Sequence, residues 1–144
     1  MELAAAELVL GFVGSEQLPA VAVRAMESGR DSPSLRQLAG LTAAETDEAR
    51  PLFEKALAEL GSSLPTVAEA VLVVARQTAQ DILAGETSPD RGAKRIWRAA
   101  LELPDEIPLE LHTFIYGASE WDERPEDRPL FAEGIVEAAK ALVD

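Results

Sequence analysis

Apolar residues recur every three or four positions along most of the chain, which is the pattern of one face of an α-helix. The clearest example runs from Pro89 to Leu101, where apolar and charged positions fall on opposite sides of the predicted helix. Similar stripes occupy residues 52–60, 109–121 and 130–142. Each stripe predicts a helix with one buried face.

The segment 66–84 is the most apolar part of the chain, and two structures fit it. Residues 70–75 are apolar all round, which suits either a central helix covered on several sides or a buried strand. A capping box at Thr66–Glu69 and a glycine at Gly85 are typical of the two ends of a helix. These flanking signals favour a helix that ends at about Ala84.

Serine, proline and glycine divide the first part of the chain into short elements. Helices are expected there at residues 3–13, 15–28, 32–40 and 42–60. A capping box at Thr42–Glu45 opens the last of these, and Pro51 predicts a break or kink within it. The whole pattern predicts an all-α protein, a compact single-domain bundle of about six to eight short helices over residues 1–144.

Composition agrees with this class and limits the partners. A chain of 144 residues is long enough for one core, which has to be aliphatic because only seven residues are aromatic. The net charge of −13 repels phosphate backbones, so we expect no nucleic-acid partner. Residues 35–42 resemble the turn of a helix-turn-helix motif. The recognition helix would then contain the acidic Glu45, Asp47 and Glu48, whose negative charge opposes contact with DNA phosphates.

Three further features bear on where the protein acts. Cysteine is absent, which is mildly typical of cytosolic proteins. The N-terminus has no basic region before its apolar stretch, and no run approaches the roughly 20 apolar residues that span a bilayer. Arginine outnumbers lysine and alanine is abundant, as in bacteria of high G+C content. We therefore expect a cytoplasmic bacterial protein without membrane contact.

No catalytic, metal or cofactor site is predicted. The only histidine, His112, is seven positions from the nearest serine on its helix, Ser119, which corresponds to roughly 10 Å along a helix and is too far for proton transfer. Position 109 is leucine, so His112 is not part of a Glu-x-x-His metal motif. Neither glycine-rich phosphate motif occurs, and the helical Gly92, Gly117 and Gly134 are expected to permit close helix packing.

The helix from Pro89 carries a basic stripe opposite its apolar face. It is formed by Arg91, Lys94, Arg95 and Arg98. One hypothesis is that the stripe is solvated or paired with the protein's own acids, for which the candidates are Glu120, Asp122, Glu123, Glu126 and Asp127. The other hypothesis is that it recognises an acidic partner or a small anion.

Two more groups are candidate binding residues. His112, Tyr116, Ser119 and Glu120 share the polar face of the helix at residues 109–121, and Tyr116, the only tyrosine, suits either an interface or ordinary intramolecular packing. Asp81, Trp97 and Trp121 are expected to line any interior pocket. Asp81 lies at the edge of an apolar stripe, and pairing with an arginine or capping of a helix is the alternative for it.

Four segments resemble a group of short bacterial proteins of unassigned role, chiefly from high-G+C bacteria. They are Asp31–Leu41, Gly85–Trp97, Ala118–Trp121 and Pro125–Arg128. The likeness implies a soluble helical domain and assigns no catalytic residue.

Taken together, the sequence favours a non-enzymatic interaction or regulatory protein, such as an adaptor or inhibitor. Its acidity suits a basic protein partner and fast association. The alternative is a helical domain that binds a small molecule or anion, including a small enzyme. A monomer and a symmetric homodimer are equally compatible with the sequence.

Overall fold

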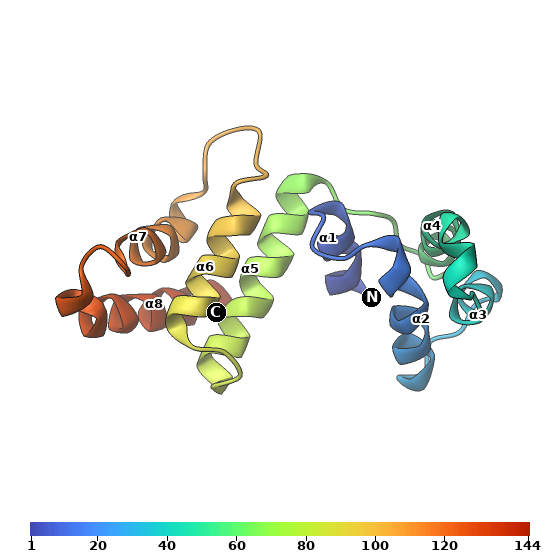
Figure 1. Ribbon diagram of the computed structural model, residues 1–144, viewed down its shortest axis with the longest axis horizontal. Coiled ribbons are helices and arrows are strands. Elements are labelled where there is room, and N and C mark those ends of the chain that lie inside the picture. Colours follow the sequence, from blue (N-terminus) through green and yellow to red (C-terminus); the bar gives the residue numbers. More distant parts are fainter. The chain divides into compact units, whose positions relative to one another are not determined.

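The computed structural model describes residues 1–144 and consists of eight α-helices and four short 3₁₀ helices, with no β-strand (Figure 1). The all-α prediction is therefore confirmed. The chain forms two compact units, residues 1–66 and 67–144, which we describe separately. The expectation that they form one domain stays a prediction. No helix has the length and apolar character needed to cross a membrane.

The first unit contains four α-helices and two 3₁₀ helices. They are α1 (Glu2–Val9), η1 (Ser15–Gln17), α2 (Leu18–Glu27), α3 (Pro33–Ala39), η2 (Ala43–Glu48) and α4 (Ala49–Glu59). Helix α3 packs against both α2 and α4. The core between them is centred on the fully buried Leu18, Leu35, Leu38 and Phe53, and α1 adds Ala5 and Leu8 to the same cluster.

Two helix boundaries in this unit differ from the predicted ones. Helix α1 ends at Val9 instead of continuing to Val13, because Gly11 adopts a left-handed conformation with φ of 75°. The capping box at Thr42–Glu45 forms, but it opens the 3₁₀ helix η2. The break lies earlier than predicted, at Glu45 inside η2, where φ is −109° and ψ is 18°. Pro51 lies in the first turn of α4, where its missing N–H needs no partner.

A glutamate on α4 fastens the start of α3. The Glu59 carboxylate accepts hydrogen bonds from the Ser34 backbone N–H at 2.9 Å and from the Ser34 hydroxyl at 2.7 Å. These two bonds, together with the Ser32 hydroxyl, hold the pKa of Glu59 below its ordinary value. Ser32 also caps α3, since its hydroxyl oxygen accepts from the Leu35 N–H at 3.1 Å.

The second unit contains the other four α-helices. They are α5 (Val67–Ala84), α6 (Pro89–Ala100), α7 (His112–Glu120) and α8 (Arg128–Val143), with η3 (Leu109–Leu111) before α7 and η4 (Pro125–Asp127) before α8. Helix α5 packs against α6 and α8, and α7 packs against the same two helices. The apolar segment 70–75 lies within α5, so the helical interpretation is confirmed and the strand alternative is wrong.

Glycine permits close packing at two of the three predicted positions. A Cβ at Gly92 of α6 would lie 2.5 Å from Cδ1 of Ile82 on α5, and a Cβ at Gly117 of α7 would lie 2.9 Å from Cδ1 of Ile135 on α8. At Gly134 the nearest atom is Thr113 Cγ2 at 3.8 Å, which is an ordinary contact. The prediction is wrong for Gly134, where an alanine side chain has room.

Candidate functional site

The basic stripe is placed on α6 as predicted, opposite the buried Ala93 and Ile96. Lys94 Nζ lies 3.6 Å from a carboxylate oxygen of Asp122, one of the acids expected to neutralise the stripe. Arg95 and Arg98 also have interaction partners. The stripe is therefore at least partly engaged within the chain, which supports the hypothesis of internal pairing without testing its role.

In the turn between α7 and α8, Arg124 and Arg128 form ion pairs and hydrogen bonds that the sequence analysis did not predict. Arg128 lies 3.6 Å from Asp122 and stacks over the Trp121 ring at 5.4 Å, while its Nε donates to the Trp121 carbonyl at 2.8 Å. Arg124 pairs with Asp127, which raises the pKa of the guanidinium above its ordinary value. Two of the expected acids, Asp122 and Asp127, are thus held by arginines close to them in sequence.

The polar face of α7 divides into separate local contacts. His112 Nε2 lies 3.0 Å from the Ile107 carbonyl, and the Ser119 hydroxyl donates to the Tyr116 carbonyl at 3.0 Å. The Tyr116 ring packs edge-on against Phe131, and its hydroxyl accepts from Arg124 at 3.1 Å. Tyr116 is still 53% exposed. It therefore anchors the α7–α8 turn and also presents part of its ring to solvent.

The third candidate group lies on three different elements. Asp81 is on α5 and accepts from the Gln77 amide at 3.1 Å, Trp97 is on α6, and Trp121 follows the last residue of α7. Both tryptophans are half-buried. None of these three residues lines the hollow at Leu109 or the hollow at Leu52. The partner of Asp81 is thus an amide of its own helix, which is neither the arginine pair nor the helix cap expected as its alternative.

The second unit has a groove of mixed apolar and polar lining between η3, the start of α7 and the end of α8, with one side chain from α5. It encloses about 400 Å³ and is lined by Leu109, Ala138, Ala141 and Leu142 together with Arg76, Glu110, Thr113 and Asp144. Leu109 is 81% exposed, more than any other large apolar side chain of the protein. We call this hollow the α7–α8 groove.

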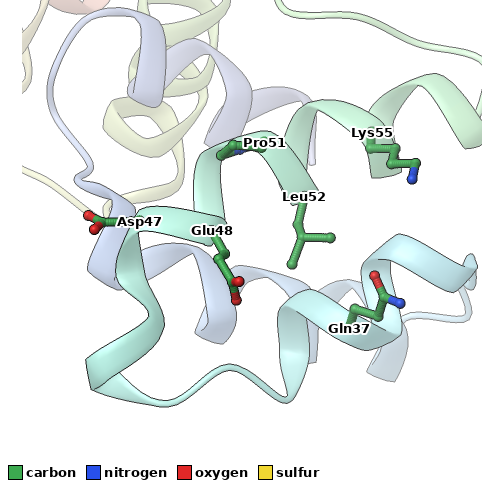
Figure 2. A pocket seen from close by; sticks show the side chains of 6 residues that line it. All are labelled: Gln37, Asp47, Glu48, Pro51, Leu52 and Lys55. Carbon is green, nitrogen blue, oxygen red and sulfur yellow. The ribbon is translucent and has the colours of Figure 1, made fainter.

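The first unit has a hollow of about 430 Å³ between α3 and α4. Gln37, Asp47, Glu48, Pro51, Leu52 and Lys55 line it (Figure 2). Neither hollow contains the elements of a metal site, because no cluster of three or more histidine and carboxylate side chains occurs in the structure. Both hollows are lined by apolar and charged side chains together.

Comparison with protein-family models, with curated proteins and with solved structures gives no significant match. The resemblance to short bacterial proteins therefore stays a prediction. The assignment of function rests on the two hollows and on the charges around them.

Sequence reasoning missed both hollows, although one signal for each was present. Leu109 lies between Pro108 and the acidic Glu110, at the first position of the helical stripe predicted at residues 109–121. Pro51 and Leu52 follow the acidic segment 45–48 by three and four residues. The packing of helices distant in sequence decides which residues lie opposite Leu109 and Leu52 across each hollow. A local sequence pattern does not predict that packing.

Proposed function

We propose that the protein is a non-enzymatic interaction protein that binds a basic protein partner through the α7–α8 groove. The observation that carries the proposal is the exposure of Leu109 at a groove that other apolar side chains also line. Single exposed leucines are common on protein surfaces, whereas a contiguous apolar surface is typical of a binding site. Leu109 lines the same groove as Ala138, Ala141 and Leu142, so four apolar side chains gather at one place here.

The charge of the second unit supports the choice of partner. Residues 67–144 contain 16 acidic and eight basic side chains. A surface of this sign attracts a basic protein over a distance of about 10 Å at 0.1 M salt and accelerates its association. The groove supplies the apolar contact, and the surrounding acids supply the long-range attraction. Association is therefore expected to weaken as the salt concentration rises.

The proposal is tested by affinity capture from the native host with two matched variants. Leu109→Ser removes the apolar side chain at the groove, and Leu130→Ser removes a leucine that is 65% exposed on α8. Leu130 lies roughly 12 Å from Ala138 along the helix axis, because each residue advances the helix by 1.5 Å. Neither substitution is expected to change stability by more than about 0.5 kcal/mol.

We expect the unmutated protein and Leu130→Ser to retain the same partner at low salt, and Leu109→Ser to lose it. Burial of a leucine contributes about 1.5–3 kcal/mol, so the affinity should fall about tenfold to a hundredfold. Equal retention by both variants would overturn the assignment of the groove. Stabilisation by a metal, a nucleotide or a metabolite, without any captured protein, would instead favour the alternative of a small-molecule or anion-binding domain.

A further inference from the structure

The hollow in the first unit has acidic, apolar and basic side chains on one side of the chain from the end of η2 into α4. Glu48 is the last residue of η2 and the N-cap of α4, and Leu52 and Lys55 follow it on α4 at four- and three-residue spacing. Figure 2 shows Glu48 and Leu52 projecting toward α3, from which Gln37 projects back. Pro51 adds a second apolar side chain, and Asp47 lies at the far edge. The floor is thus apolar, and one end carries two carboxylates.

The neighbouring charges leave these two carboxylates unpaired. Glu45 bonds to the Thr42 N–H and hydroxyl, and Glu54 pairs with Arg50 at 3.2 Å. Asp47 and Glu48, by contrast, form no hydrogen bond or ion pair through their side chains. Acidic side chains near an apolar floor are therefore available to a cation from outside the chain.

Of the other basic side chains in this part of the unit, Arg36 has an acidic partner and Lys55 is distant from Glu48. Arg36 pairs with Asp31 at 3.1 Å. Lys55 is seven residues from Glu48, which corresponds to roughly 10 Å along the helix axis, and its charge acts on Glu59. Lys55 therefore leaves the acidic end of the hollow uncompensated, and it disfavours a second cation at the other end.

We propose that this hollow binds an arginine side chain that stands beside an apolar residue in a partner protein. A guanidinium group binds carboxylates with two parallel hydrogen bonds, and its aliphatic stem packs on apolar surface. Glu48 receives the guanidinium, and Pro51 and Leu52 contact the stem and the neighbouring apolar residue. This site is on the other unit from the α7–α8 groove, and the inference does not depend on the function proposed for that groove.

The binding site is tested with a defined peptide and its neutral analogue. The peptide is N-acetyl-leucyl-arginine amide, and the analogue contains citrulline, in which a neutral urea replaces the guanidinium. Amide chemical shifts of the isotope-labelled full chain are followed by NMR during titration to millimolar concentrations. We expect saturable shifts confined to Gln37 and residues 47–55 with the arginine peptide, and at least threefold weaker binding of the citrulline peptide.

Two variants assign the contact to a particular carboxylate. Glu48→Gln should weaken binding of the arginine peptide about threefold to tenfold, since it removes the charge of the hydrogen-bond acceptor. Glu54→Gln is the matched control, because Glu54 lies on α4 and already pairs with Arg50. The proposal is overturned by scattered or absent shifts, by equal binding of both peptides, or by equal effects of the two variants. The comparison of the two peptides uses only the unmutated chain, so it tests the proposal even if Glu48→Gln does not fold.

Discussion

The contact between α5 and α6 leads to a prediction about Gly92. A Cβ at this position would lie 2.5 Å from Ile82 Cδ1, 2.6 Å from Ile82 Cγ1 and 3.3 Å from Thr78 Cγ2. The first two distances are well below van der Waals contact, and Ile82 is itself buried. Overpacking of this kind costs about 1–3 kcal/mol, whereas alanine gains about 1 kcal/mol over glycine in a helix. Gly92→Ala should therefore lower the free energy of unfolding by up to about 2 kcal/mol.

Gly134→Ala is the matched control, because it gains the same helix propensity without the clash. Its Cβ would lie 3.8 Å from Thr113 Cγ2, so we expect the free energy of unfolding to rise by up to about 1 kcal/mol. The Ile82→Ala background removes both clashing atoms. There Gly92→Ala should become neutral or stabilising, and the two positions should be coupled by about 1 kcal/mol or more.

Urea denaturation followed by circular dichroism gives all of these free energies. The reasoning would be refuted if Gly92→Ala were as stable as Gly134→Ala, or if its effect were the same with isoleucine and with alanine at position 82. Either result would mean that α5 and α6 move apart at little cost, and that close packing is not the reason for glycine at this position.

Two further predictions concern charged side chains. Asp122→Asn removes the exposed ion pairs with Lys94 and Arg128, so the free energy of unfolding should fall by at most about 1 kcal/mol. Thermal melts at two salt concentrations should show a smaller decrease at high salt, because salt screens exposed charges. The carboxylate of Glu59 has a lower pKa in the folded protein than in the unfolded chain. Its contribution to the free energy of unfolding is therefore fully present above the pKa of the unfolded chain, and it is lost as the pH falls through the pKa of the folded protein. Glu59→Gln should therefore destabilise the protein at neutral pH, and urea titrations should show this difference shrinking below about pH 4.

Local signals predicted the helices well because they depend on nearby residues. The cap at Ser32, the proline at the start of α6 and the glycine after α5 lie where the sequence pattern puts them. The boundaries differ where the first turns are 3₁₀ instead of α, as at residues 43–48 and 109–111. The same capping residues begin an α-helix or a 3₁₀ helix, so the sequence does not distinguish these two kinds of helix.

The candidate sites were harder to predict because they join residues far apart in the chain. The bond from Ser34 to Glu59 spans 25 positions. The α7–α8 groove brings Leu109 near Leu142. The basic stripe was identified correctly as a face of α6, yet its partner Asp122 could be given only as one of several acids. Periodicity predicts which side of a helix is buried, whereas the neighbour that covers that side depends on the tertiary packing.

Hydrogen exchange with the captured partner tests the central proposal most directly. Backbone amides of the full chain are compared in the presence and absence of the purified partner by mass spectrometry. Binding at the α7–α8 groove predicts slower exchange at residues 109–113 and 138–144, the two segments that contain most of its lining residues, and unchanged exchange around Leu130. Slower exchange confined to other segments, with residues 109–113 and 138–144 unchanged at saturating partner, would contradict the proposal.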